Sequence, residues 1–278
     1  MNTLTETEQF KANPIYLIPI LASLLAGLVF SYVLLLNPIE TLPVTPFPET
    51  PSGSLSNAVY FVVLIAIAAT IFYLLIKWKS KKMISVLIGF AMTAASLLLS
   101  AFYSTALLLS LPNWEIYVAI IAIAVTVVFD FAVFKGSETS RNVVVVLLGG
   151  ALGVFLGWSI PILSAVLILA FLAVYDIITV YKGPVGKIAS SGLDQLKGLS
   201  FSFRDIQMGL GDLVFYSMLC AAMLRWLSWY AYVFSFIGVV VGSFVTFRIL
   251  EKRGIFPGLP VPIFLGLICG FLGSFIPV

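Results

Sequence analysis

Long apolar segments, separated by short groups of charged residues, make up almost the whole chain. No Lys, Arg, Asp or Glu occurs within residues 12–39, 50–76, 83–114 or 142–175. A membrane-spanning helix needs ~20 predominantly apolar residues, and in lipid its backbone polar groups must be paired within the helix. The pattern therefore predicts an all-α polytopic membrane protein with nine transmembrane helices, at residues 14–36, 57–76, 84–111, 115–134, 143–158, 162–181, 206–225, 228–248 and 257–277.

Local sequence features indicate where these helices begin and end. The segment 142–175 is long enough for two helices, with a break expected near Trp158–Pro161. The segment 37–56 carries five prolines and is predicted to be an extended loop. The first apolar block is too long for a signal-peptide core and lacks a small-residue cleavage site, so we expect it to remain as a helix. Residues 1–278 are predicted to form one membrane domain, without a second domain or a low-complexity tail.

The distribution of Lys and Arg predicts the orientation. With the N-terminus in the cytoplasm, 14 of the 15 basic residues fall in cytoplasmic segments, and only Arg225 falls outside. Cytoplasmic loops of membrane proteins carry an excess of Lys and Arg. We therefore expect a multi-pass protein of the plasma membrane with a cytoplasmic N-terminus and an external C-terminus.

Composition narrows the chemistry further. Charged residues make up 10% of the chain, against about 25% in soluble domains. The sequence contains no histidine, which excludes Ser-His and Cys-His catalytic pairs and His-ligated zinc or haem. Cys220 and Cys269 lie within apolar segments and are predicted to be small buried side chains. No metal, no cofactor and no nucleic-acid partner is expected.

Small residues four positions apart predict close contacts between helices, since they let helix backbones approach each other in lipid. Such rows occur at Gly149, Gly153 and Gly157, at Gly238 and Gly242, and at Gly266 and Gly270. We interpret all three rows as packing positions.

Three acidic residues lie inside the predicted spans: Asp130, Asp176 and Asp212. An acidic side chain at the middle of the membrane costs roughly 2.5–3.5 kcal/mol, so such residues are candidates for a functional role. Asp130 lies five residues before Lys135 and is expected to reach the interface or to pair with that lysine. Glu115 is expected at the first turn of a helix, where the helix dipole favours an acid.

Asp176 and Asp212 are predicted to lie at the same depth. Each is five or six residues from the cytoplasmic end of its span, which places both roughly 8–9 Å below that surface. Two carboxylates in one site share a proton, so one can deprotonate water while the other polarises a peptide carbonyl. The alternative is that each is a structural Asp, hydrogen-bonded to a Tyr or to a backbone amide.

Short motifs surround both residues and open the last span. Asp176 follows Tyr175, and Asp212 ends the run Gly209-Leu210-Gly211-Asp212. Two glycines before an acid remove side chains, so that a substrate backbone can approach the carboxylate. The last span opens with Pro257, Gly258, Leu259 and Pro260, followed by Pro262. Prolines remove backbone donors, which predicts irregular backbone next to the carboxylates.

These three motifs, together with the nine-span pattern, resemble the presenilin and signal peptide peptidase family of intramembrane aspartyl proteases. The compact length is similar to that of an archaeal presenilin homologue. The resemblance covers the whole chain and implies Asp176 and Asp212 as the catalytic residues of a GxGD-type aspartic endopeptidase. It also implies that Pro257, Leu259 and Pro260 shape the active site and help to bind substrate. The family usually has Ala where this chain has Gly258.

The resemblance implies single-span transmembrane proteins or peptides as substrates. A cytoplasmic N-terminus is typical of the presenilin-like members, so substrates with external N-termini are expected. The segment 182–205, between the two aspartates, is predicted to be a flexible loop that covers the site and offers an edge to an unwound substrate. The sequence leaves oligomerisation and self-cleavage in this loop open.

Two alternatives remain. A prepilin-peptidase-like protease also uses a Gly-x-Gly-Asp motif, but it would lack the motif at Pro257–Pro260. An ion- or proton-coupled transporter would line its path with Asp130, Asp176 and Asp212, and broken helices suit such a protein. No inverted repeat relates the two halves of the sequence, which weakens the transporter interpretation.

Overall fold

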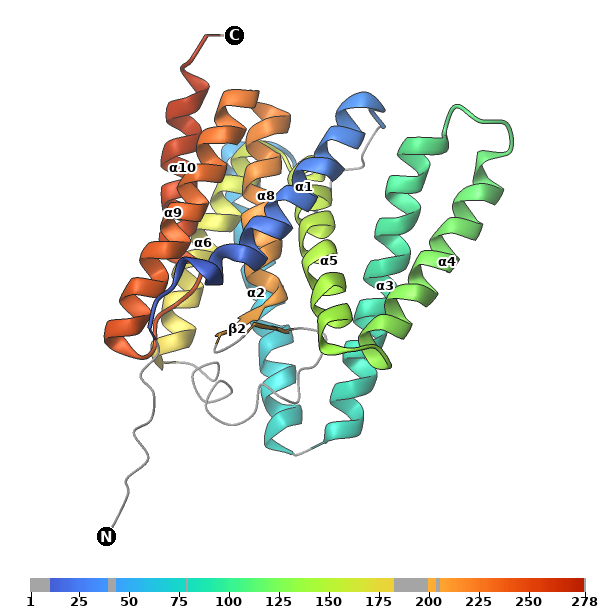
Figure 1. Cartoon of the computed structure of the whole chain (residues 1–278). Coiled ribbons are helices and arrows are strands. Elements are labelled where there is room, and N and C mark those ends of the chain that lie inside the picture. Colours follow the sequence, from blue (N-terminus) through green and yellow to red (C-terminus); the bar gives the residue numbers. More distant parts are fainter. Residues whose placement is uncertain (1–10, 40–43, 79, 183–199, 204–205, 278) are drawn as a thin grey trace.

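The computed structural model describes residues 11–39, 44–78, 80–182, 200–203 and 206–277, and these form a helical bundle (Figure 1). Each predicted span overlaps one α-helix. Within the described residues the helices are α1 (Ile18–Leu36, preceded by the 3₁₀ turn η1, Pro14–Leu17), α2 (Pro51–Lys77), α3 (Lys81–Leu108), α4 (Trp114–Phe134), α5 (Glu138–Ser159), α6 (Ile162–Lys182), α8 (Leu210–Trp226), α9 (Trp229–Arg253) and α10 (Pro260–Ser274).

Seven of these helices are long and apolar enough to cross a membrane, which supports an integral, multi-pass membrane protein. The two shorter ones are α8, with 17 residues, and α10, with 15 residues. Nine membrane crossings therefore stay a prediction. The break between α5 and α6 falls at Ile160 and Pro161, where the sequence predicts it.

The prediction of an extended loop over 37–56 is too long at its C-terminal end, because α2 already begins at Pro51. Thr50 is extended and its hydroxyl oxygen accepts a hydrogen bond of 3.1 Å from the backbone N–H of Gly53. A capping Thr followed by Pro at the first helical position is a favourable helix start, because an N–H at that position would have no partner within the helix. The proline that suggested a loop thus begins a helix.

The prediction that a helix begins at residue 206 is wrong. Residues Ile206–Gly209 form strand β2, which pairs antiparallel with β1, Ser200–Phe203, with Ser200 opposite Gly209. The backbone groups of residues 206–209 are therefore used in a hairpin, and α8 begins only at Leu210. As a result Asp212 lies in the first turn of α8 rather than well inside a helix.

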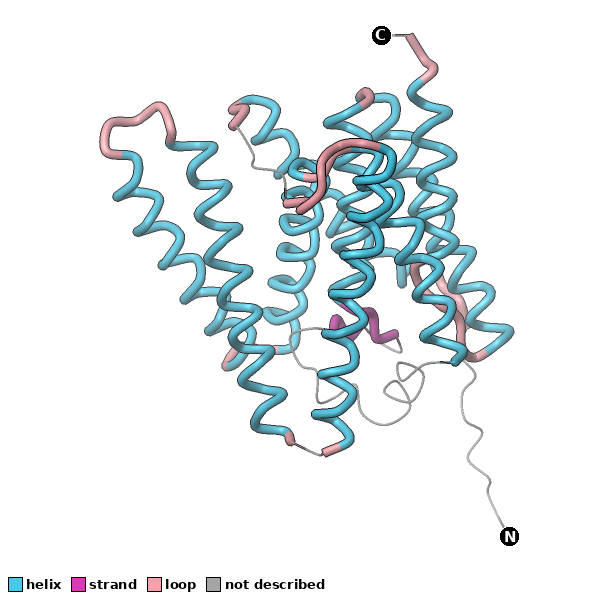
Figure 2. The backbone as a smooth tube through the Cα atoms, turned by 180° about the vertical axis from the view of Figure 1, so that it is seen from behind, coloured by secondary structure: helices cyan, strands magenta, loops and turns pink. Residues whose placement is uncertain are grey.

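Helix α8 is the central element of the bundle. It packs against α1, α5, α6, α9 and α10, and almost all its side chains from Leu213 to Leu224 are buried. The pair α3 and α4 lies at the side of the bundle and leans away from the other helices in both views (Figures 1 and 2). A helix buried on every side holds the residues at its start in a fixed place.

The glycine rows are packing positions, as predicted. A Cβ atom added at Gly153 of α5 would lie 2.5 Å from both the Ser217 Cβ and the Val214 carbonyl oxygen of α8. A Cβ atom at Gly242 of α9 would lie 2.6 Å from the Pro262 Cα of α10. Only glycine allows such close approach, so these rows fix α5 on α8 and α9 on α10.

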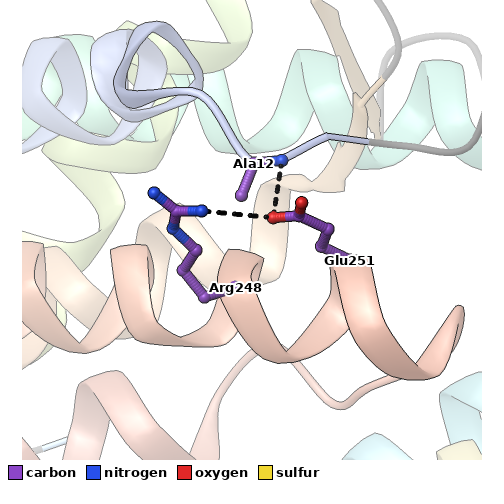
Figure 3. A network of polar contacts seen from close by, with 3 residues as sticks. All are labelled: Ala12, Arg248 and Glu251. Atoms are coloured by element: carbon purple, nitrogen blue, oxygen red, sulfur yellow. Dashed lines mark hydrogen bonds and ion pairs between the residues drawn. The ribbon is translucent and has the colours of Figure 1, made fainter.

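The N-terminal segment is attached to the end of α9 (Figure 3). The backbone N–H of Ala12 donates a hydrogen bond of 3.2 Å to Glu251 Oε2, which also lies 3.5 Å from Arg248 Nη1. The end of α6, strand β2 and the start of α8 lie in the lower half of Figure 1, above the lowest ends of α2 and α3, and the end of α10 lies at the upper end. Which end faces the cytoplasm stays a prediction.

Candidate active site

The two predicted catalytic carboxylates lie on neighbouring helices. Asp176 is on the last third of α6, and Asp212 is in the first turn of α8. Helices α6 and α8 pack against each other, and α10 packs against both. The third motif, directly before α10, is therefore placed between the two carboxylate-bearing helices.

Asp176 is hydrogen-bonded to this third motif. The backbone N–H of Leu259, which caps α10, donates a bond of 3.0 Å to Asp176 Oδ2. The first N–H groups of a helix have no partner within the helix, and Pro260 and Pro262 have no N–H at all. The N–H of Leu259 therefore has no partner within α10 and is free to donate to the Asp176 carboxylate of α6.

Asp212 contacts the residue directly before Leu259. A Cβ atom added at Gly258 would lie 3.0 Å from Asp212 Oδ2 and 3.4 Å from its Cγ. Gly258 is therefore in contact with Asp212, and the next residue, Leu259, is bonded to Asp176. The carboxylates themselves are near enough to interact electrostatically. Asp176 and Asp212 thus lie beside the same two residues, although the depth argument counted a helix from residue 206, and residues 206–209 are strand β2.

Tyr216 is a further residue at this site that the sequence analysis does not identify. It is buried on α8, four residues after Asp212, and its hydroxyl donates a hydrogen bond of 2.9 Å to the carbonyl oxygen of Gly258. Residues i and i+4 of a helix lie on the same face. The spacing of four residues from Asp212 is therefore the sequence feature that points to Tyr216.

The two glycines of the Gly209–Asp212 motif lie beside the carboxylates. Gly209 ends β2 and Gly211 lies in the first turn of α8, and both are exposed. A Cβ atom added at Gly209 would meet nothing nearer than the Gly211 nitrogen at 3.9 Å, and one at Gly211 would meet Phe215 at 3.7 Å. The backbone before Asp212 is therefore open to an approaching chain.

The remaining predicted residues are more enclosed. Pro257 and Pro260 are buried, whereas Tyr175 and Leu210 are half-buried. Residues 255–257 have no regular secondary structure, but Pro260 and Pro262 lie in the first turn of α10, so the irregular backbone predicted from the prolines ends at Leu259. The predicted loop 182–205 lies mostly outside the described residues, and its described part includes β1.

Asp130 lies apart from this group. Its Oδ2 accepts a hydrogen bond of 2.8 Å from the Thr93 hydroxyl of α3, rather than pairing with Lys135. Helix α4, which carries Asp130, packs mainly on α3 and α5. Glu115 lies in the first turn of α4, as expected.

The two cysteines and the possible metal-ligand side chains form no larger cluster among the described residues. Cys220 is buried and Cys269 is half-buried, and both are free thiols. Among the residues described, no three His, Cys, Asp or Glu side chains are grouped so that they could hold a metal ion.

The fold and this site define a class: a multi-pass helical membrane protein with aspartates on two neighbouring helices, α6 and α8, that both lie against the segment before α10. Comparison with family models agrees with that class. The model described as "Signal-peptide peptidase, presenilin aspartyl protease" matches residues 18–195, and the model described as "Presenilin" matches residues 187–277. The chain belongs to the signal-peptide peptidase and presenilin aspartyl protease family.

The fold is similar to that of solved structures. Two are described as a presenilin family intramembrane aspartate protease, in the C222 and the P2 space group. The first has a TM-score of 0.65 at 19% identity over 92% of this chain and 96% of the other. The second has a TM-score of 0.66 at 20% identity over 92% and 95%. The comparison with curated protein sequences gave no match.

Proposed function

We propose that this protein is a GxGD-type intramembrane aspartic endopeptidase in which Asp176 and Asp212 together activate water. Its substrates are transmembrane proteins or peptides, cut within or near their membrane-spanning helices. The observation that carries the proposal is the contact of the two carboxylates with consecutive residues, Gly258 at Asp212 and Leu259 at Asp176. The family assignment supports the same activity.

The chemistry needs only these two side chains and water. Two neighbouring carboxylates hold one proton between them. The ionised one takes a proton from water as the water oxygen bonds to the peptide carbonyl carbon, while the protonated one donates a hydrogen bond to the carbonyl oxygen. The C–N bond then breaks, and the departing amine takes up a proton. No covalent enzyme intermediate forms.

A peptide bond in a helix must become extended before water can attack it. The β1–β2 hairpin leads directly into the Gly209–Asp212 motif, and within the described residues β1 pairs with β2 alone. The other edge of β1 offers backbone groups to an extended substrate segment, as in other cases of strand addition. Deletion of residues 186–200 removes most of the segment 182–205 and the first residue of β1. An unchanged cleavage rate and cleavage site would reject a role of this segment in cleavage.

We further propose that the protein works in the plasma membrane with its N-terminus in the cytoplasm, as the distribution of Lys and Arg predicts. Fusing a reporter domain to each terminus and testing its access to added protease in sealed right-side-out vesicles measures this orientation. We expect the C-terminal reporter to be digested and the N-terminal reporter to be protected. The reverse result would contradict the orientation.

The experiment that tests the activity compares wild-type protein with the double variant Asp176→Asn, Asp212→Asn in proteoliposomes. We expect wild-type protein to cleave a single-span substrate and the double variant to be inactive, with no ion flux in either. Ion-coupled flux that the double variant loses, without cleavage by the wild type, would instead indicate a transporter.

A further inference from the structure

The hydroxyl of Tyr216 joins α8 to the backbone that contacts both carboxylates. Tyr216 is only 2% exposed, and its hydroxyl donates to the carbonyl oxygen of Gly258 at 2.9 Å. The carbonyl of Gly258 and the N–H of Leu259 belong to one peptide group. Tyr216 is therefore bonded to the carbonyl oxygen of the planar peptide group whose N–H is bonded to Asp176.

The segment before α10 depends on such contacts for its position. Helix α9 ends at Arg253 and is followed by Gly254, which adopts a left-handed conformation, and residues 255–257 have no regular secondary structure. Pro257 has no N–H to donate. The carbonyl of Leu259 is already bonded within α10, to the N–H of Ile263 at 3.1 Å. The backbone of residues 258 and 259 is hydrogen-bonded to α6 through Asp176 and to α8 through Tyr216.

The same helix carries Asp212, one turn before Tyr216. Because α8 is buried on all sides, the Tyr216 ring and the Asp212 carboxylate keep fixed positions relative to each other on the same face of the helix. Gly258 is thus fixed relative to Asp212 through the Tyr216 hydroxyl, and Leu259 is fixed relative to Asp176 through its own N–H. One peptide group aligns the carboxylates of two helices.

We propose that Tyr216 is a positioning residue for the aspartate pair. Its hydroxyl fixes the peptide group between Gly258 and Leu259, and that peptide group sets how Asp176 and Asp212 face each other. The inference rests on the proposed function, since it assigns a role within the same site. Tyr216 itself does not touch the reacting atoms, so it acts on the alignment of the pair and not on substrate binding.

The variant Tyr216→Phe tests this role, with Tyr103→Phe as the matched control. Tyr103 is also buried, and its hydroxyl also donates to a backbone carbonyl of another helix, that of Ala151, at 2.7 Å. Each variant removes one oxygen atom and keeps the ring. Both are expected to melt at similar temperatures, because each loses a buried hydrogen bond to a backbone carbonyl and one further contact, with the Ser243 side chain for Tyr216 and with the Phe155 backbone for Tyr103.

For Tyr216→Phe we expect kcat to fall roughly 10- to 100-fold while KM changes less than about 2-fold, because misalignment slows the chemical step without removing a substrate contact. Tyr103→Phe is expected to keep both constants. Hydrogen exchange gives a second measurement: the amides of residues 255–259 should exchange faster in Tyr216→Phe than in the wild type or in Tyr103→Phe.

Equal kcat values for the two variants, together with unchanged exchange at residues 255–259, would overturn the proposal. A loss confined to KM would overturn it as well, because it would make Tyr216 a substrate-binding residue. Failure of the proposed function looks different: the wild type would then not cleave at all, or Asp176→Asn would still cleave.

Discussion

The backbone N–H of Leu259 donates a hydrogen bond of 3.0 Å to Asp176 Oδ2, although 83 positions separate the two residues in the sequence. This bond connects α6 with the start of α10. Hydrogen bonds to a carboxylate are shorter and stronger than those between neutral groups. The bond therefore fixes the Asp176 carboxylate against the same peptide group that Tyr216 holds from α8.

Replacing Leu259 by Pro removes this N–H, and replacing it by Ala keeps the N–H but shortens the buried side chain. A hydrogen bond to a charged group contributes about 1.5–3 kcal/mol. We therefore expect Leu259→Pro to cleave about 10- to 100-fold more slowly than Leu259→Ala. Initial rates on one peptide substrate measure the difference. Equal rates for the two variants would show that the N–H has no role in cleavage.

Gly258→Ala introduces a methyl group that faces Asp212. The Cβ atom would lie 3.0 Å from Oδ2, so the carboxylate must move by a few tenths of an ångström. A misplacement of about 1 Å in a catalytic group can lower the rate about 100-fold, so we expect a smaller loss, roughly 3- to 10-fold in kcat. A kcat equal to that of the wild type would mean that Asp212 has enough room to adapt.

Asp130→Asn should leave cleavage within about 2-fold of the wild type, because general acid–base catalysis requires reach to the reacting atoms. The Thr93 hydroxyl can still donate to the side-chain amide oxygen of the variant, so the contact between α3 and α4 is kept. Cleavage assays on this variant distinguish a protease that uses only Asp176 and Asp212 from a protein whose activity also needs Asp130. A complete loss of cleavage in a stably folded variant would contradict the assignment.

Gly153→Ala should destabilise the protein, whereas Gly89→Ala should not. At Gly153 the new Cβ would lie 2.5 Å from atoms of α8, but at Gly89 it would meet only the Phe134 ring, at 3.5 Å. Overpacking costs about 1–3 kcal/mol, whereas Ala in an unobstructed helix position gains about 0.5–1 kcal/mol over Gly. Thermal unfolding in detergent measures both, and similar melting temperatures would contradict the tight contact of α5 with α8.

Much of this fold follows from the apolar pattern. The break between α5 and α6 at Pro161 and the irregular backbone before α10 were predictable, because proline acts on the backbone locally. The start of α2 at Pro51 was not, since a proline can either interrupt a helix or occupy its first position. Which of the two occurs depends on the preceding residue, here the capping Thr50.

Strand β2 was missed for a different reason. Residues 206–209 directly precede α8 and continue its apolar segment, and their pairing with residues 200–203 makes them a strand. Such pairing is a contact between segments, which the apolar pattern of either segment alone does not reveal. Which residues contact Asp176 and Asp212 also depends on how segments distant in the sequence pack together. The sequence analysis predicted that Asp176 and Asp212 share a site, but not that the backbone of Gly258 and Leu259 lies against both of them.

The most direct test of the aspartate pair is mass spectrometry of cleavage products. Wild-type protein, Asp176→Asn and Asp212→Asn are each incubated in lipid with a single-span helical peptide, and the product masses locate each cut. We expect the wild type to cut within or near the apolar segment and each variant to lose at least about 100-fold in rate, since each carboxylate acts as a general acid or base. Products of the same mass and yield from either variant would contradict the account.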